Sequence, residues 1–268
     1  MTTGRFHKMH GLGNDFVIID ARHKEIDLSA AQAAAIADRH SGIGCDQLII
    51  LRPSGQADVR MQIFNADGGE VEACGNAARC VTKLLGEESR IETAGGIIVG
   101  SATADGAIVD MGQPRFEWQS IPLAYAMDTL RMPVGWEDLE NPAAVNVGNP
   151  HVIFFVDDSN VVELERLGAM IEVDPLFPDK VNVNVAHLAD GIVHLRVWER
   201  GVGLTRACGT GACAAAVAAI KRGLVTSPVQ VDLPGGSLTI SWKDGETIQM
   251  QGPTTYVFAG EADWAQFG

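Results

Sequence analysis

The sequence is short of positive charge and lacks long apolar runs. Its 268 residues carry 20 Lys and Arg against 34 Asp and Glu, a formal net charge of −14. Nucleic-acid-binding proteins normally present a basic face, so this balance argues against a nucleic acid as partner. The longest small-apolar run, Ala212–Ile220, is too short to span a bilayer. The segment Met1–His10 lacks the apolar core of a signal peptide, so we expect a soluble, cytoplasmic protein.

The sequence also lacks the usual signatures of metal and disulfide sites. None of its five cysteines belongs to a Cys-x-x-Cys pair. Their spacings fit neither a zinc ribbon nor the disulfide framework of a secreted domain. The acidic residues show no metal-ligand spacing, so a solvated surface is their default role. We expect Cys45, Cys80 and Cys213 to be free and buried as small hydrophobes.

What the sequence does contain is an internal repeat. The motif ACGNAARC at 73–80 recurs as ACGTGAC at 207–213. Further matched segments follow in the same order along the chain: GNDFVI with GNPHVI at 13–18 and 148–153, TAGG with LPGG at 93–96 and 233–236, and MGQP with MQGP at 111–114 and 250–253. The simplest explanation is a duplicated domain, with related halves at roughly 1–113 and 144–253 and a connection over 115–143.

Each half is predicted to combine short strands with two helices. In the first half a helix over 29–39 opens with Ser29 and Gln32 spaced as a capping box. A second helix follows Cys74 and ends near Leu85, with Gly86 as its terminating residue. Alternation and turn signals predict strands at 16–20, 48–51, 59–65, 91–93, 97–101 and 107–111.

The matching helices of the second half are predicted at 164–171 and 212–221. From Ala212 to Ile220 the second of these carries no polar side chain on any face. A helix that is apolar all round is buried on all sides. We interpret it as a helix enclosed by a curled sheet, with an ordinary core helix under one sheet face as the alternative.

The chemistry is predicted from the two helix starts, each of which carries a cysteine. Cys74 and Cys208 would lie among unsatisfied N–H groups at the positive end of a helix dipole. That environment favours the thiolate by lowering the pKa of the thiol. The same N–H groups can hold a ligand carboxylate. Each copy of the motif therefore supplies a possible base and half of an anion site.

Polar residues also match across the repeat: Asn14 with Asn149, Gln47 with Asn182, and Asn65 with Glu199. If the halves face each other, one thiol can remove a proton from a carbon acid and the other can return one. This pattern predicts a two-base racemase or epimerase that needs no metal and no organic cofactor, and whose thiols titrate as a pair. A dithiol redox protein would not need the matched polar residues, and a duplicated binding protein would not need a cysteine at each helix start. Both remain open.

Taken together, the motifs resemble those of the diaminopimelate epimerase family in their order. They are HGLGNDF at 10–16, FNADG at 64–68, ACGN at 73–76, GNPH at 148–151, and ERG at 199–201 leading to ACGTGAC at 207–213. The second cysteine motif also occurs in proline racemase, so a proline racemase-like isomerase is the nearest alternative. The motifs around Asn14 and Asn65 favour the diaminopimelate branch.

The resemblance implies interconversion of LL- and meso-2,6-diaminopimelate, a step of lysine and peptidoglycan biosynthesis. It implies an α+β fold of two pseudo-symmetric domains, each a barrel-like, mostly antiparallel sheet around a central helix, with the active site in the cleft between them. The domains would cover 1–113 plus a returning tail at 254–268, and 114–253. Members of the family commonly form homodimers.

The resemblance also assigns roles to individual residues. Cys74 and Cys208 match the catalytic bases, and His151 and Glu199 match residues that assist proton movement. The groups that hold the carboxylate at the reacting centre match Gly75, Asn76, Gly209 and Thr210. The remaining substrate contacts match Asn14, Gln47, Asn65, Asn149, Asn182 and Arg200. Ala77 and Leu204 depart from the usual family pattern, but neither position supplies a thiol or a matched polar group.

Overall fold

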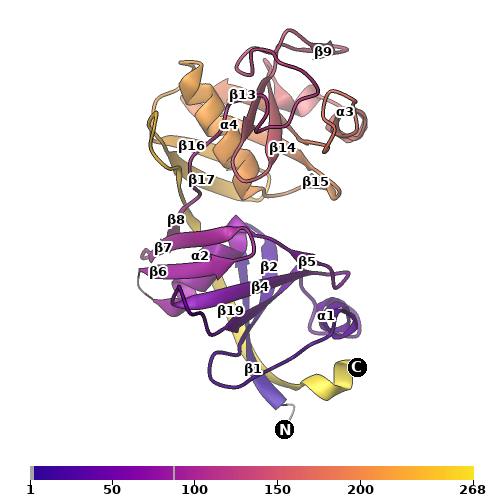
Figure 1. Ribbon diagram of the computed structural model, residues 1–268, viewed down its shortest axis with the longest axis vertical. Helices are drawn as coiled ribbons and strands as arrows, with labels where there is room; N and C mark the ends of the chain where they lie inside the picture. The colour runs from indigo at the N-terminus through magenta and orange to yellow at the C-terminus, as the bar shows by residue number, and fades with distance from the viewer. Residues whose placement is uncertain (1–2, 87) are drawn as a thin grey trace. The chain divides into compact units, whose positions relative to one another are not determined.

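The computed structural model describes residues 3–86 and 88–268. The chain divides into two compact units (Figure 1). Unit 1 comprises Met1–Val109 together with Gly252–Gly268, and unit 2 comprises Asp110–Gln251. Each unit combines a mostly antiparallel sheet with two α-helices, so the α+β class expected from the resemblance is confirmed.

The sheet of unit 1 follows the order β19, β1, β2, β3, β4, β6, β7, β8, with the short β5 paired to β4. Only the pairs β2–β3 and β4–β6 are parallel. The strands are β1 (Thr3–Gly11), β2 (Asn14–Asp20), β3 (Gln47–Arg52), β4 (Val59–Asn65), β5 (Glu70–Val71), β6 (Ser89–Thr93), β7 (Gly96–Ala102), β8 (Gly106–Asp110) and β19 (Thr255–Asp263).

The helices of unit 1 begin and end where the sequence predicts. Helix α1 (Ala30–Ala37) is preceded by Ser29, whose side chain and that of Gln32 form the predicted capping box. Helix α2 (Gly75–Leu85) begins directly after Cys74 and ends at Gly86, which adopts a left-handed φ of 94°. Such a backbone conformation favours glycine, because a Cβ atom would be strained there.

Unit 2 repeats this plan. Its sheet follows the order β11, β12, β13, β14, β16, β17, β18, and β15 pairs with β14. The parallel pairs are β12–β13 and β14–β16, the counterparts of those in unit 1. The strands are β11 (Ala143–Asn146), β12 (Pro150–Phe155), β13 (Asn182–Ala189), β14 (Ile192–Glu199), β15 (Gly203–Thr205), β16 (Val229–Leu233), β17 (Gly236–Ser241) and β18 (Gln249–Pro253).

Strand register confirms the duplication at the level of single residues. In unit 1, Phe16 lies opposite Gln47 across the parallel pair β2–β3. In unit 2, His151 lies opposite Asn182 across β12–β13, and these are the residues that the repeat matches to Phe16 and Gln47. The repeat in the sequence therefore corresponds to one architecture built twice.

Helix α4 (Gly209–Lys221) is the buried helix that the sequence predicts. Every residue from Ala212 to Ala219 is fully buried. The helix contacts the strands β11, β12, β13, β14, β16 and β17. In the described part of the chain, the strand pairings do not close either sheet into a complete barrel, so the barrel-like sheets are open. The other helix of unit 2, α3 (Leu164–Glu172), packs against β13 and β14.

Two regions differ from the sequence-based expectation. Strands β1 and β19 were not predicted, and they pair antiparallel from Thr3 with Asp263 to His10 with Thr255. The repeat alone suggests a connection over 115–143, whereas the resemblance places it in the domain 114–253; it is part of unit 2. Its apolar residues Ile121, Leu123, Met132 and Leu139 belong to that unit's core. It also forms the short β9 (Gly135–Trp136) and β10 (Leu139–Glu140). Within the residues that the structure describes, no helix is long and apolar enough to cross a membrane.

The capping box of α1 gives a stability prediction. Replacing Ser29 with Ala leaves the N–H of Gln32 without its 3.2 Å hydrogen bond to Ser29 Oγ. We expect Ser29→Ala to lower the free energy of unfolding, measured by urea denaturation, by about 1 kcal/mol. Ser29→Asp is the matched control, because aspartate caps equally well and should stay within about 0.5 kcal/mol of the parent. Equal losses in both variants would contradict the capping role.

Candidate active site

The predicted site residues of unit 1 gather at one edge of its sheet and at the start of α2. Asn14 begins β2, Gln47 begins β3 and Asn65 ends β4. Cys74 caps α2, and its Sγ lies 3.9 Å from Asn14 Oδ1. The first bond inside the helix runs from Ala78 N to Cys74 O, so the N–H groups of Gly75 and Asn76 precede it. These N–H groups can bind an anion, as predicted for a helix start.

A chain of hydrogen bonds fixes the orientation of Asn14 beside the thiol. Asn76 Nδ2 donates to Asn14 Oδ1 at 3.2 Å, and Arg79 Nη2 donates to Asn76 Oδ1 at 2.9 Å. At the other end, Asn14 Nδ2 donates to Asp46 Oδ2 at 3.0 Å. Because a guanidinium only donates and a carboxylate only accepts, the two charged ends determine how both amides point. The Asn14 oxygen therefore faces Cys74.

Asp46, at the acidic end of this series of hydrogen bonds, belongs to a cluster of charged side chains. Arg39 Nη2 lies 2.6 Å from Asp46 Oδ1 and 2.6 Å from Asp15 Oδ1. Burial alone would raise the pKa of Asp15, but hydrogen bonds from Arg39 and Lys8 outweigh it and lower that pKa to about 2. Asp15 N also donates to Asp46 Oδ2 at 3.0 Å, which ties the two carboxylates to one cationic cluster.

Gln47 and Asn65 form a second group in unit 1. They lie opposite each other across β3–β4, and Gln47 Nε2 donates to Asn65 Oδ1 at 2.9 Å. The other amide atom, Gln47 Oε1, is buried and has no hydrogen-bond partner among the described residues. Buried polar atoms are normally paired, so this oxygen fits an acceptor for a ligand donor.

In unit 2, Cys208 caps α4 and is almost fully buried, with 4% of its surface exposed. Its Sγ accepts the N–H of Gly211 at 3.3 Å and lies 3.5 Å from Thr210 Oγ1. The first bond within the helix joins Ala212 N to Cys208 O, so the N–H groups of Gly209 and Thr210 precede it.

The environment of Cys208 corrects one expectation from the sequence. Burial, followed by the negative charge of Glu199, raises the pKa of the Cys208 thiol well above its ordinary value. The hydrogen bonds from Thr210 and Gly211 act in the opposite direction but are smaller. The expectation that the helix start lowers the pKa of this thiol is therefore wrong, because desolvation penalises the thiolate more than the N–H groups stabilise it.

Glu199 is partly buried and lies beside Cys208. Burial raises its pKa, while hydrogen bonds from Thr205 and Cys208 partly oppose that shift. Thr205 Oγ1 donates to Glu199 Oε1 at 2.5 Å. Cys208, Thr210 and Glu199 thus form one group within unit 2.

His151 and Asn149 form another group. The fully buried His151 ring lies with Nε2 2.9 Å from Asn149 Oδ1 and Nδ1 3.1 Å from Asn184 Nδ2. Burial lowers the pKa of His151 to about 3, and the positive charge of Arg200 adds to the lowering. Both effects favour the neutral form of the ring.

Asn182 and Arg200 are linked through backbone groups. Asn182 Nδ2 donates to Pro150 O at 2.8 Å, and Asn182 Oδ1 accepts the N–H of Arg200 at 2.9 Å. The Arg200 side chain is exposed and donates from Nη1 to Asp179 O at 2.9 Å. The Asn182 side chain thus links β12 to the end of β14. The Arg200 guanidinium has other N–H groups that can donate to a ligand.

The remaining cysteines behave as predicted. Cys45, Cys80 and Cys213 are buried. Burial raises the pKa of Cys45 to about 11 and that of Cys80 to about 12. In the described part of the chain, no three His, Cys, Asp or Glu side chains are grouped so as to hold a metal ion.

Several residues of these networks were not predicted from the sequence, among them Asp46, Arg79, Asn184 and Thr205. A signal existed for Asn184, which lies two residues after Asn182 on a strand and so faces the same side. Asp46 precedes Gln47 within a motif already assigned to the site. For Arg79 and Thr205 the sequence gives no local sign, because their roles depend on the side chains they meet.

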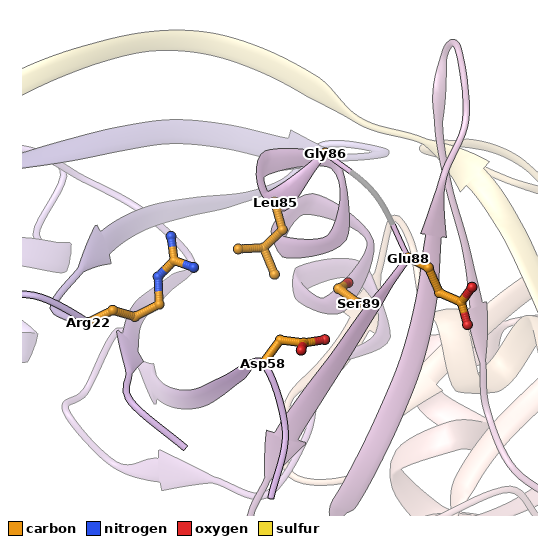
Figure 2. Close-up of a pocket in the computed structure, with 6 residues that line it drawn as sticks. All are labelled: Arg22, Asp58, Leu85, Gly86, Glu88 and Ser89. Atoms are coloured by element: carbon orange, nitrogen blue, oxygen red, sulfur yellow. The ribbon is translucent and has the colours of Figure 1, made fainter. Parts of the chain in front are cut away.

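A cavity of about 390 Å³ lies elsewhere in unit 1 (Figure 2). It is at the C-terminal end of α2, whereas Cys74 is at the N-terminal end. Its lining residues include none of the predicted site residues: Arg22, Asp58, Leu85, Gly86, Glu88 and Ser89. We therefore locate the candidate chemistry at the helix starts and not in this cavity.

Comparison with known proteins agrees with this geometry. A family model described as diaminopimelate epimerase matches residues 6–117 and 143–257. The diaminopimelate epimerase of Rhizorhabdus wittichii is 63% identical over 98% of this chain and 97% of its own. That of Sphingopyxis alaskensis is 63% identical over 98% and 99%, and that of Zymomonas mobilis 59% identical over 99% of both chains.

Solved structures with low sequence identity share the fold. A phenazine biosynthesis protein of the PhzF family from Bacillus anthracis has a TM-score of 0.71 at 16% identity, covering 98% of this chain and 99% of that one. A hydroxyproline epimerase from Agrobacterium vitis has a TM-score of 0.67 at 16% identity, covering 98% and 91%. At this level of identity the likeness concerns the fold alone.

The Glu199–Cys208 contact gives a pH prediction. The Glu199 charge raises the pKa of the Cys208 thiol, so Glu199→Gln removes that contribution and lowers it. More thiolate is then present at a given pH, and alkylation of Cys208 by iodoacetamide, followed by peptide mass spectrometry, should begin at lower pH than in the parent. Glu163→Gln is the control, since the exposed Glu163 pairs with Arg166. An alkylation curve that stays in place or moves to higher pH would contradict the assignment.

Proposed function

The chain belongs to the diaminopimelate epimerase family, and on that premise we propose that it interconverts LL- and meso-2,6-diaminopimelate in lysine and peptidoglycan biosynthesis. The observation that carries the proposal is the cysteine at the N-cap position of both α2 and α4, at matching positions of the repeat. A two-base reaction at one carbon needs two such groups, one to take a proton and one to give it.

The proposed reaction needs only these side chains. One cysteine, as the thiolate, removes the α-proton, and the C–H bonding electrons spread into the adjacent carboxylate. The helix-start N–H groups stabilise that charge: those of Gly75, Asn76, Gly209 and Thr210. The other cysteine, as the thiol, delivers its proton to the opposite face of the carbon. The net change is inversion, with the two sulfurs exchanging protonation states.

The surroundings of Cys208 support a proposal for which cysteine is protonated when the reaction begins. Burial and the neighbouring Glu199 favour the protonated form of Cys208. We therefore propose that Cys208 enters the cycle as the thiol and Cys74 as the thiolate, and that Glu199 assists by controlling the proton on Cys208. His151 contributes through the Asn149 amide to which its Nε2 is hydrogen bonded.

The remaining polar residues are proposed as substrate contacts. Diaminopimelate carries an ammonium and a carboxylate at each end, and the acceptor Gln47 Oε1 and the donors of Arg200 suit those groups. The full proposed set of contacts adds Asn14, Asn65, Asn149 and Asn182. Asn182 contributes by fixing Arg200, because both of its amide groups are bonded to the backbone.

The two earlier alternatives have less support. A proline racemase-like isomerase would share the cysteines, but the family match runs through both halves of this chain. A dithiol redox protein would not require the buried carboxylate beside Cys208, which opposes formation of the thiolate there.

The proposal predicts exchange of the α-proton with solvent. With reduced protein and LL-diaminopimelate in D₂O, with chelator and no added cofactor, proton NMR should show loss of the α-proton signal and appearance of the meso isomer. Cys74→Ala and Cys208→Ala should each abolish both changes, because each removes one of the two bases. Cys45→Ala is the matched control, since Cys45 is a buried thiol outside both groups.

Two outcomes would contradict this assignment. Exchange of proline in place of diaminopimelate would move the protein to the proline racemase branch. No exchange of either amino acid, in protein that remains folded, would favour a redox or binding function.

We also propose that the domains follow the repeat, with boundaries near 113/114 and 253/254, and that the protein acts in the cytoplasm. A biosynthetic role in amino-acid metabolism, as the names of the relatives indicate, supports this location. Fractionation of the source cells, with activity followed in the soluble cytosolic fraction, tests the location.

A homodimer is the proposed assembly. Three consecutive apolar residues of β19, Tyr256, Val257 and Phe258, are about half exposed. Exposed apolar side chains of this kind can contribute to an interface between protein chains. We expect sedimentation equilibrium to give twice the chain mass of 28.5 kDa at micromolar concentration. The mass of a single chain across the whole concentration range would contradict the dimer.

A further inference from the structure

A buried polar pair, His151 and Asn184, stands where unit 1 has an apolar pair. Both side chains are fully buried in unit 2. The matching positions of the repeat in unit 1 hold Phe16 and Ile49, which are also fully buried. The same architecture therefore forms with two hydrophobes at this place. Burying polar groups is costly unless they are hydrogen bonded, so the pair points to a function and not to a requirement of the fold.

The orientation of the Asn184 amide is fixed by its surroundings. Asn184 Nδ2 donates to Val152 O at 3.0 Å and lies 3.2 Å from Asn182 O. A flipped amide would place its oxygen against two carbonyl oxygens, which is repulsive. The nitrogen of Asn184 is therefore the atom that faces His151, at 3.1 Å from Nδ1.

This orientation selects the tautomer of His151. An amide nitrogen donates and does not accept, so the ring nitrogen beside it must carry a lone pair. The single ring proton then resides on Nε2, which lies 2.9 Å from Asn149 Oδ1 and donates to it. A second proton on Nδ1 would face the Asn184 N–H groups directly, which adds to the cost of burying an imidazolium.

The tautomer of His151 also determines the orientation of the Asn149 amide. Because its oxygen accepts from His151, its nitrogen is the atom left to donate. An amide donor suits a carboxylate, the group that the proposed substrate carries at both ends. His151 thus acts as a neutral donor that sets the direction of Asn149.

We infer that Asn184 is a positioning residue that holds the proton of His151 on Nε2, so that His151 presents the Asn149 amide nitrogen to a substrate carboxylate. The inference depends on the proposed function only for the identity of the ligand. The tautomer itself follows from the contacts within unit 2.

The neighbouring glycine supports a specific place for Asn184. A Cβ atom on Gly211 would lie 2.8 Å from Asn184 Oδ1, closer than side chains tolerate. The matching residue of unit 1 is Ala77, and the repeat partner of Asn184 there is Ile49. Gly211 also donates its N–H to Cys208 Sγ. Asn184 therefore packs against Gly211, the residue whose N–H donates to Cys208. Asn184 and Gly211 occupy the positions that Ile49 and Ala77 hold in unit 1.

The charged group that acts on the His151 ring is Arg200, at the end of β14, and it disfavours a second proton. Together with burial, this keeps the ring neutral well below physiological pH. An ordinary histidine titrates between pH 5 and pH 8, whereas both effects on His151 favour its neutral form in that range.

Two-bond ¹H–¹⁵N NMR spectra of the full-length protein, labelled in its histidine rings, test the tautomer without any substrate. We expect His151 to show a protonated Nε2 and an unprotonated Nδ1, unchanged from pH 5 to pH 8. His187 and His194 are internal controls, because both rings are partly exposed. His151→Phe, which restores the residue of unit 1, identifies the His151 signals. A proton on Nδ1, or an imidazolium within this range, would overturn the inference.

A near-isosteric variant tests the role of Asn184. Asn184→Asp places an acceptor beside Nδ1, so we expect the proton to move to Nδ1 and the pH profile of kcat/KM to gain an ionisation between pH 5 and pH 8. Asn184→Leu, which neither donates nor accepts, should not gain it. An unchanged tautomer in folded Asn184→Asp overturns the positioning role. If Asn184→Asp fails to fold, the tautomer of His151 in the spectrum of the parent protein tests the inference. If no turnover of diaminopimelate is found, the proposed function fails, but the NMR spectrum still tests the tautomer by itself.

Discussion

The candidate site depends on one constraint, which is that the first N–H groups of an α-helix have no partner inside the helix. In both units the helix body is packed against strands, and the first intrahelical bond ends on a cysteine carbonyl, that of Cys74 in α2 and Cys208 in α4. Each start therefore presents a thiol beside N–H donors whose positions are fixed before any ligand arrives. Donors held in advance stabilise developing negative charge better than solvent, which must reorient.

Duplication provided two such starts, and divergence of their surroundings made them different. Arg79, fully buried and bonded to Asn76, has Cys213 as its repeat partner in unit 2. Asn65 has Glu199 as its partner, and the Glu199 charge disfavours the Cys208 thiolate. A cation thus stands behind the first motif and a carboxylate beside the second. Two thiols in identical surroundings would share one proton without preference, whereas a two-base reaction needs one ionised and one protonated sulfur.

The parts of the fold that local chemistry dictates could be predicted from the sequence. The capping box at Ser29, the glycine stop at Gly86 and the all-apolar helix around Ala216 each carry their signal within a few residues. Strands β1 and β19 could not be predicted, because they stabilise each other from opposite ends of the chain. The matched polar positions could be named from the repeat. Their partners Arg79 and Thr205 could not, since a hydrogen-bonded network is defined only by the side chains that meet in space.

The pKa of Cys208 shows why a local argument about a helix start is insufficient. The dipole and the N–H groups do favour a thiolate, but they act on a sulfur that is almost fully buried beside a carboxylate, and desolvation is the larger effect. In such surroundings an additional charge has a larger effect on the pKa of the thiol, because the low dielectric constant strengthens electrostatic interactions. An imidazolium in the core of unit 2 would add a positive charge to the half of the protein that holds its thiol protonated. A neutral His151, with its proton fixed on Nε2, can direct the Asn149 amide without adding charge. In the proposed arrangement, burial and the two amides fix the orientation of His151, and the protonation of Cys208 is governed by its own burial and by the Glu199 charge.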